Sequence, residues 1–159
     1  MLENNQTAPD FSLLNQAQQT IQLSHFKDKK NVVLYFYPKD DTPGCTIEAN
    51  QFTALANEFA ALDTVIIGVS KDTCESHQAF IDKYNLNLEL LADVGGTLCE
   101  SYGVWQEKEN NGIKKMGIVR PTFIINKQGA LAYVEYGVNA DFHAQPILNE
   151  IKQLKWARR

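Results

Sequence analysis

Two runs of the chain are apolar at nearly every position, a pattern typical of strands that are buried on both faces of a sheet. They are residues 31–37 (NVVLYFY) and residues 64–69 (TVIIGV). After each run, apolar residues recur at helical spacing, which predicts helices over about residues 45–61 and 73–84. Because a helix connects the two strands, we expect them to be parallel, with their carboxyl ends at the same edge of the sheet. The apolar face of the first helix is expected to consist of Ile47, Phe52, Leu55, Phe59 and Leu62.

Shorter segments complete the predicted sheet and its covering layers. Residues 11–14 with 20–23, and residues 122–126 with 131–136, have the alternation and turn residues of two hairpins. The remaining predictions are a short strand at 90–91, a short helix at 97–102, an exposed polar loop at 106–115 with a turn at 110–112, and a last helix at 142–154. This order predicts one α/β domain over residues 1–159. We expect a thioredoxin-like fold, with a central mixed β-sheet flanked by helices and preceded by an N-terminal β-hairpin.

Length and charge narrow the class of protein. The chain has 159 residues, enough for one well-buried core, and a formal net charge of −4. An acidic balance without clustered Lys and Arg excludes a nucleic-acid or anionic-membrane surface. No apolar stretch approaches the roughly 18 residues of a membrane helix, and the polar first ten residues do not resemble a signal peptide. Three widely spaced cysteines do not form a secreted disulfide framework, so we expect a cytoplasmic protein.

Cys45 is the strongest candidate for chemistry. It follows the first buried strand and a polar Pro–Gly turn, and it stands where the next helix begins. The first N–H groups of a helix lack intrahelical partners, and the helix dipole adds partial positive charge there. Both features favour a thiolate, the form of a cysteine that attacks the O–O bond of a peroxide.

Two further side chains could donate hydrogen bonds to the sulfur and to the oxygen that leaves. Thr42 lies in the turn three residues before Cys45, and Arg120 immediately precedes a predicted strand. Each also has a plainer interpretation. Thr42 could simply cap the helix, and Arg120 taken by itself fits a surface ion pair equally well.

Residues 35–48 (YFYPKDDTPGCTIE) resemble the active-site stretch of peroxiredoxins, matching P-x-x-x-T-x-x-C through Pro38, Thr42 and Cys45. The TPGCTxE form is similar to the peroxiredoxin Q branch, also called bacterioferritin comigratory protein. The resemblance covers nearly the whole chain, since it extends to residues 8–11 (APDF), 68–72 (GVSKD), 102–108 (YGVWQEK) and Arg120.

The resemblance implies a thiol-dependent peroxidase that reduces hydrogen peroxide and organic hydroperoxides without a metal or an organic cofactor. Cys45 would be the peroxidatic cysteine, cycling through a sulfenic acid, and Thr42 and Arg120 would activate it and bind the substrate. Pro38 would shield the sulfur from solvent, and Glu48 would orient neighbouring groups. Thioredoxin is the implied reductant, with glutaredoxin or glutathione as alternatives. The chain lacks a long C-terminal extension beyond the final helix, which favours a monomer, with a weak dimer also open.

The chain departs from this family at the resolving cysteine, because the two usual positions hold Asn50 and Ile81. Cys74 is a candidate substitute, since it lies near the start of the helix after the second strand, at the same sheet edge as Cys45. A disulfide needs the two Cα atoms within about 7 Å, so the turn at Cys45 would have to unwind. Cys99 fits a buried structural thiol better. A one-cysteine cycle with an external thiol also stays open.

Three other functions compete with the peroxidase. A thioredoxin-like disulfide oxidoreductase needs C-x-x-C, and the fourth position here is Glu48. A glutathione-peroxidase-like enzyme shares the fold but fits the pairing of Thr42 with Arg120 poorly. A redox sensor that is oxidised once at Cys45, without turnover, is the non-enzymatic alternative.

The histidines suggest no metal centre. Cys74 and His77 are three residues apart on a predicted helix and could form half of a zinc site, but no second pair is apparent. His77 is therefore interpreted as a polar surface residue. His25 and His143 stand at predicted element boundaries and are expected to face solvent.

Overall fold

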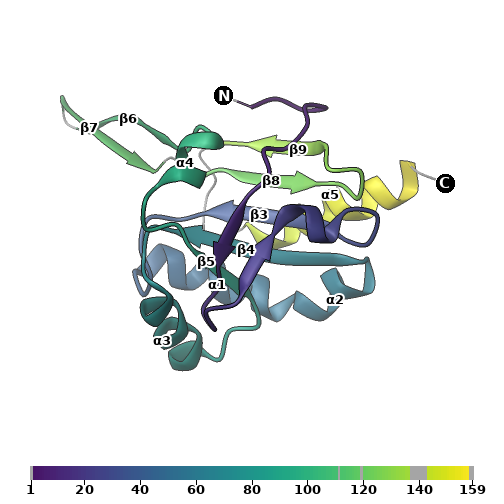
Figure 1. The fold of residues 1–159 in the computed structure, drawn as a ribbon, viewed down its shortest axis with the longest axis horizontal. Helices are drawn as coiled ribbons and strands as arrows, with labels where there is room; N and C mark the ends of the chain where they lie inside the picture. Colours follow the sequence, from purple (N-terminus) through teal and green to yellow (C-terminus); the bar gives the residue numbers. More distant parts are fainter. Residues whose placement is uncertain (1, 111, 119, 137–142, 158–159) are drawn as a thin grey trace.

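The computed structural model describes residues 2–110, 112–118, 120–136 and 143–157, which form a five-stranded sheet between two covering layers (Figure 1). The strands are β3 (Asn31–Phe36), β4 (Thr64–Ser70), β5 (Glu89–Ala92), β8 (Thr122–Ile125) and β9 (Leu131–Glu135). Their order across the sheet is β5-β4-β3-β8-β9. β3 pairs with β4 and β4 with β5 in parallel, whereas β3 with β8 and β8 with β9 are antiparallel. The predicted mixed sheet, and the parallel pairing of the two buried strands, are confirmed.

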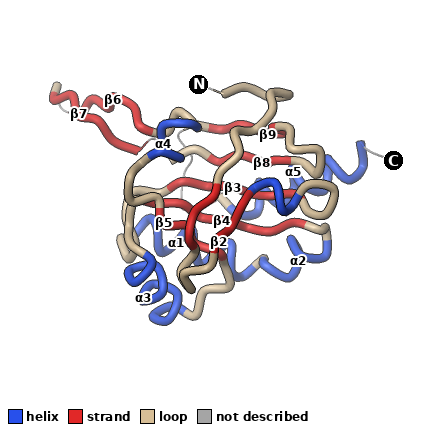
Figure 2. The backbone as a smooth tube through the Cα atoms, in the orientation of Figure 1, coloured by secondary structure: helices blue, strands red, loops and turns tan. Residues whose placement is uncertain are grey.

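Different elements cover the two faces of the sheet (Figures 1 and 2). One face packs against α1 (Pro43–Ala54), α2 (Ala56–Ala61), α3 (Cys74–Tyr84) and α5 (Ala144–Ala157). The other lies under the hairpin of β1 (Ser12–Leu14) and β2 (Thr20–Gln22), the 3-10 helix η1 (Leu23–Phe26) and α4 (Thr97–Ser101). None of the helices in the described part of the chain is long and apolar enough to cross a membrane.

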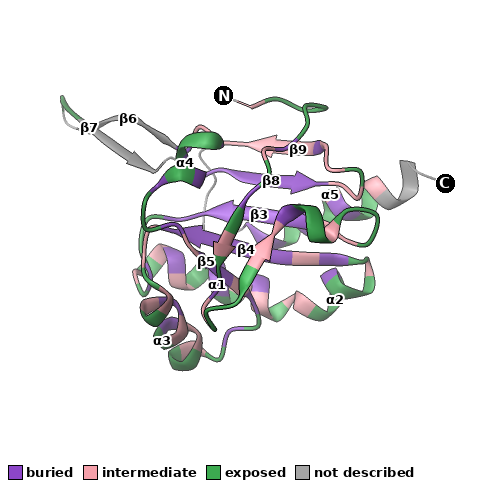
Figure 3. Ribbon diagram, in the orientation of Figure 1, coloured by how far each residue is buried: buried purple, intermediate pink, exposed green. Residues whose placement is uncertain are grey.

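Strand β3 supplies side chains to both halves of the core, because successive residues of a strand point to opposite faces. Leu34 and Phe36 pack beneath the N-terminal hairpin, whereas Tyr35 lies on the face that α1 covers, where it stacks on Phe52. All four side chains are buried, and strands β3, β4 and β8 of the sheet are buried almost along their whole length (Figure 3). A continuous apolar run was the correct signal for this strand.

The expected helix over residues 45–61 is wrong in two respects. It is interrupted at Leu55, whose φ of −102° and ψ of 6° end α1 before α2 begins. Ile47 was expected on the apolar face, but its side chain is 41% exposed. The buried positions of α1 are Cys45, Glu48, Ala49 and Phe52, and Ile47 falls off that face.

The polar stretch expected as a loop at 106–115 is instead an antiparallel hairpin. Strand β6 (Trp105–Asn110) pairs with β7 (Ile113–Ile118), with Trp105 opposite Ile118 (Figure 1). Its charged residues have low strand propensity, which explains the mistaken prediction; pairing of the backbone N–H and C=O groups forms the ladder nevertheless. The other predicted elements agree with the structure to within two residues, except the last helix, which ends at Ala157, three residues later than expected. Its expected start at residue 142 lies outside the described residues.

Candidate active site

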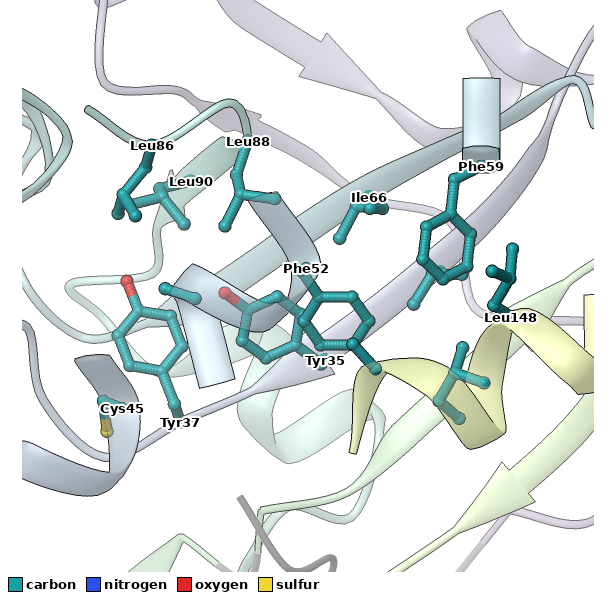
Figure 4. Close-up of a cluster of buried hydrophobic side chains, with 14 of the residues drawn as sticks. Tyr35, Tyr37, Cys45, Phe52, Phe59, Ile66, Leu86, Leu88, Leu90 and Leu148 are labelled. Atoms are coloured by element: carbon teal, nitrogen blue, oxygen red, sulfur yellow. The ribbon is translucent and has the colours of Figure 1, made fainter. Parts of the chain in front are cut away.

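The fold holds Cys45 in the first turn of α1, where the chain enters the helix after β3. Thr42 is the N-cap residue, Pro43 is the first helical residue, and the first intrahelical bond runs from the Thr46 N–H to the Thr42 carbonyl at 2.8 Å. The N–H groups of Gly44 and Cys45 therefore point out of the helix start without intrahelical acceptors. Cys45 is 2% exposed and lies at the edge of the aromatic core beside Tyr37 (Figure 4).

Arg120 reaches this sulfur because β8 runs antiparallel to β3 and so begins where β3 ends. The Phe36 N–H donates to the Pro121 carbonyl at 3.1 Å, which fixes the two segments side by side. The Arg120 Nη1 donates to Cys45 Sγ at 3.2 Å, and its Nη2 donates to Glu48 Oε1 at 2.9 Å. One guanidinium thus joins the thiol to a buried carboxyl group.

Glu48 has no exposed surface, since it lies on the buried face of α1 one turn after Cys45. Burial raises the pKa of its carboxyl group from 4.5 to about 7, although the charge and hydrogen bond of Arg120 oppose the shift. Oε1 accepts from Arg120, whereas Oε2 has no hydrogen-bond partner in the described part of the chain. A carboxyl group with this pKa can hold or release a proton near neutral pH.

His143 lies behind Glu48, and its expected exposure to solvent is wrong. The residue is 4% exposed; its Nε2 is 2.5 Å from Thr122 Oγ1 and 3.9 Å from Glu48 Oε2. Its ring packs edge-on against Phe52. Burial and the Arg120 charge lower the pKa of His143 to about 4, so the imidazole is neutral at neutral pH. The sequence carried no local signal for this contact, which depends on how α5 packs against α1.

Thr42 and Pro38 belong to the same loop but do not bond to the sulfur in this structure. Thr42 is at the N-cap of α1, as the capping interpretation requires, but its hydroxyl donates to the Lys39 carbonyl at 2.9 Å and its side chain makes no capping bond to the helix. Thr42 is half-buried, three residues before Cys45. Pro38 is exposed, directly after the buried Tyr37.

A buried network attaches this loop to α3. Asp40 accepts hydrogen bonds from the Tyr37 hydroxyl at 2.6 Å and the Ser76 hydroxyl at 2.8 Å, and its Oδ2 lies 2.8 Å from His77 Nδ1. The opposite ring nitrogen of His77, Nε2, donates to the Leu91 carbonyl at 2.8 Å. His77 has no exposed surface, so its interpretation as a surface residue is wrong. We call the buried pair Asp40–His77 the loop latch.

Asp41, the next residue, also attaches this loop to α3, at the protein surface. Asp41 accepts from Lys83 at 2.7 Å and from the Tyr84 hydroxyl at 2.5 Å, and both partners lie in the last turn of α3. These bonds hold the pKa of Asp41 below its ordinary value. Two consecutive aspartates therefore dock the loop before Cys45 along the length of α3.

The other two cysteines differ in their surroundings. Cys74 is half-buried and is the first residue of α3, where the Thr73 hydroxyl caps the helix by accepting from the Ser76 N–H at 3.1 Å. Cys99 is fully buried in α4, and burial raises the pKa of its thiol far above the ordinary value. The prediction of a buried structural thiol at Cys99 fits this environment.

One group of described residues has the composition of a cation site. The ligand atoms of Asp40, Asp72 and His77 lie within 4.8 Å of one another. Asp72 Oδ2, however, already accepts from the Asp40 N–H at 2.8 Å and from the Ser70 hydroxyl at 2.7 Å. These atoms are engaged in hydrogen bonds, so the cluster belongs to the network that fixes the loop.

Known proteins with the same sequence pattern and shape are numerous. The AhpC/TSA family model matches residues 5–134. Peroxiredoxin Bcp of Bacillus subtilis is 44% identical over 153 residues, which cover 96% of this chain and 97% of that protein. Peroxiredoxin Bcp of Escherichia coli is 35% identical over 146 residues, which cover 92% and 93%.

Two solved structures share the whole fold. The bacterioferritin comigratory protein of Xanthomonas campestris, studied for alkyl peroxide reduction, superimposes with a TM-score of 0.88 at 32% identity, covering 97% of this chain and 98% of that one. A PrxQ variant of Xylella fastidiosa gives 0.90 at 29% identity, covering 98% of each chain. The thioredoxin-like fold is thereby confirmed. The chain belongs to the AhpC/TSA family, in its peroxiredoxin Bcp (PrxQ) branch, and is a thiol-dependent peroxidase.

Proposed function

We propose that Cys45 is the peroxidatic cysteine of this chain and that Arg120 activates it, with Thr42 as a second donor. The observation that carries the proposal is the 3.2 Å hydrogen bond from Arg120 Nη1 to Cys45 Sγ, at a helix start with free N–H groups. A positive charge and orphan backbone donors both stabilise a thiolate and the negative charge that develops on a departing oxygen. Neither Cys74 nor Cys99 has a guanidinium donor in the described contacts, although Cys74 also stands at a helix start.

In the proposed reaction the Cys45 sulfur attacks one oxygen of the hydroperoxide. The S–O bond forms as the O–O bond breaks, and the electron pair leaves with the other oxygen, which takes up a proton to give water or an alcohol. Cys45 becomes a sulfenic acid, which a second thiol converts to a disulfide with release of water. We propose hydrogen peroxide and organic hydroperoxides as substrates, because the Xanthomonas campestris relative is studied for alkyl peroxide reduction.

Cys74 is the proposed resolving thiol, and attack by an external thiol is the alternative. Cys74 begins the helix that follows β4, and β4 is the parallel neighbour of β3, so both cysteines follow adjacent strand ends. The loop latch also joins the segment before Cys45 to the first turns of α3. Cys45 is buried in a helical turn, so the disulfide requires this turn to open.

The proposed catalytic cycle requires a reductant, and we extend the proposal to the location and oligomeric state of the protein. A thiol reductant must regenerate Cys45, and we propose thioredoxin, with glutaredoxin or glutathione as alternatives, in the cytoplasm. We propose that residues 1–159 act as one domain and as a monomer. The large apolar side chains that are exposed in the described residues come from four different segments of the chain: Leu14, Ile47, Val94 and Ile113.

Turnover with a recycling system tests the proposal. Peroxide consumption is followed in the presence of thioredoxin, thioredoxin reductase and a nicotinamide reductant. Cys45→Ser should abolish consumption and Cys99→Ser should leave it intact. Activity that survives Cys45→Ser would refute the assignment. Wild-type protein that consumes only one equivalent of peroxide, even with the reductant present, would indicate a redox sensor.

A further inference from the structure

The acidic groups around Arg120 outnumber the positive charges. Cys45 Sγ and Glu48 Oε1 both accept hydrogen bonds from the one guanidinium of Arg120, and both residues are almost completely buried. A buried charge without a partner costs several kcal/mol, so a thiolate and a carboxylate in this position cannot both be compensated by one cation. The site therefore favours one negative charge and one proton, shared between two acids.

Among the residues that the structure describes, the other titratable side chains that face Glu48 supply no second positive charge. His143, at the start of α5, is 3.9 Å from Oε2, but its pKa of about 4 leaves it neutral. Tyr35, on β3, is fully buried, its hydroxyl has no partner in the described residues, and burial raises its pKa well above 10, so it stays protonated. Arg120 is therefore the charge partner for both acids.

The position of each acid along α1 decides where the proton rests. Cys45 is in the first turn, where two N–H groups have no intrahelical acceptor and the helix dipole favours a negative charge. Glu48 lies one turn further along, where the N–H groups are engaged within the helix. The thiolate is thus the better stabilised anion, and the free oxygen of Glu48, Oε2, is available to carry the proton.

We propose that Glu48 accepts the proton of the Cys45 thiol and then passes it to the oxygen that leaves the hydroperoxide. This inference rests on the proposed role of Cys45. The thiol gives its proton to the Glu48 carboxylate, and the resulting thiolate attacks one peroxide oxygen as the O–O bond breaks. The departing alkoxide takes the Glu48 proton and leaves as an alcohol. The products are a Cys45 sulfenic acid and a Glu48 carboxylate, so thiol plus hydroperoxide yields sulfenic acid plus alcohol with no proton taken from solvent.

The decisive variant is Glu48→Gln, which keeps the size and an oxygen that accepts from Arg120, but can neither hold a negative charge nor carry this proton. The variant removes the negative charge that competes with the sulfur for Arg120, so the fraction of Cys45 present as thiolate at pH 6 should rise. Its reaction with tert-butyl hydroperoxide should nevertheless slow on the order of 10²-fold, the usual contribution of a general acid. A role that merely orients Arg120 would lower both quantities together.

Two peroxides separate proton delivery from orientation of Arg120. The alkoxide that leaves tert-butyl hydroperoxide needs a proton, whereas the carboxylate that leaves peroxyacetic acid does not. Glu48→Gln should lower the rate constant with tert-butyl hydroperoxide at least tenfold more than the rate constant with peroxyacetic acid. Both are measured by stopped flow on protein whose only cysteine is Cys45. Glu58→Gln, which removes an exposed carboxyl group from α2, is the matched control and should change neither rate.

Each outcome bears on a different claim. Equal slowing of both peroxides by Glu48→Gln would overturn the proton transfer and leave the role of Cys45 intact. Peroxidase activity in Cys45→Ser would instead remove the function on which the inference rests. If Glu48→Gln fails to fold, the wild type still decides: deuterium oxide should slow the reaction with tert-butyl hydroperoxide more than that with peroxyacetic acid, and equal slowing would refute the transfer.

Discussion

Arg120 Nη1 lies 3.2 Å from Cys45 Sγ across 75 residues of sequence, and the backbone of Arg120 has a φ of +52°. Residues other than glycine rarely adopt this left-handed conformation, and such strain is found mainly at functional sites. Strand pairing compensates for the strain, because Pro121 accepts a hydrogen bond from Phe36 and β8 continues along β3. The sheet therefore supplies the site with a guanidinium that no residue near Cys45 in the sequence provides.

Replacing Arg120 by Lys should slow oxidation of Cys45 by hydrogen peroxide on the order of 10²-fold. A lysine ammonium retains the charge but lacks the planar fork that contacts Cys45 Sγ and Glu48 Oε1 together. The rate of sulfenic acid formation, followed by stopped-flow fluorescence, measures the effect. Lys127→Met removes a positive charge from an ion pair with Asp63 near the surface and should leave the rate unchanged. A near-normal rate in Arg120→Lys would show that charge alone suffices.

Breaking the loop latch should destabilise the protein strongly. Asp40→Asn disrupts the buried hydrogen bonds of Asp40 with Tyr37, Ser76 and His77, and each buried polar group that loses its partner costs about 1–3 kcal/mol. Urea denaturation gives the free energy of unfolding. Asp41→Asn, which alters the adjacent exposed pair with Lys83, is the matched control and should have little effect. Similar unfolding midpoints for the two variants would mean that the latch does not stabilise the fold.

The neutral state of His143 makes stability depend on pH. The pKa of His143 falls from 6.5 to about 4 on folding. The contribution of the neutral imidazole to the free energy of unfolding is therefore fully present above pH 6.5 and is lost as the pH falls toward 4. His143→Gln, which cannot be protonated, should lack this loss, and the wild type should lose about 3 kcal/mol more than the variant between pH 7 and pH 4. Denaturation at several pH values measures the difference. His25→Gln changes an exposed histidine and should track the wild type; parallel curves for His143→Gln would contradict a buried neutral imidazole.

The resolving route is decided by the cysteine variants after oxidation. If Cys74 resolves, one equivalent of peroxide should give the wild type an internal disulfide, seen as a loss of two hydrogens in the intact mass. Cys74→Ser should then stop at the sulfenic acid, whereas Cys99→Ser should still form the bridge. A wild-type protein that forms no disulfide, but turns over with thioredoxin or glutathione, would follow the one-cysteine cycle.

Much of the fold could be predicted because its strands carry strong local patterns. The two apolar runs gave β3 and β4, their parallel pairing, and the sheet edge at which Cys45 stands. The hairpin β6–β7 was missed because its polar residues lack a strand signal. Ile47 was misplaced because an apolar residue at an approximate helical position need not face the core.

Residues of the site could be predicted only where the local sequence or the family motif indicated them. Cys45 and Arg120 were both predicted as candidate site residues, and the structure brings them into contact. His77, inside a predicted helix, and His143, at a predicted element boundary, were expected at the surface but are buried, because a single histidine has no periodicity that reveals burial. Their partners, Asp40 and Thr122, are 37 and 21 residues away, so these contacts exist only once the helices have packed.

The identity of the oxidised cysteine is the central claim, and one mass measurement tests it. Cys74→Ser protein is treated with one equivalent of hydrogen peroxide together with a trap for sulfenic acids, then digested and sequenced by tandem mass spectrometry. We predict a single trap adduct on the peptide that contains Cys45 and an unmodified Cys99. Disappearance of the peroxide while Cys45 stays an unmodified thiol, or an adduct on Cys99 alone, would contradict the account.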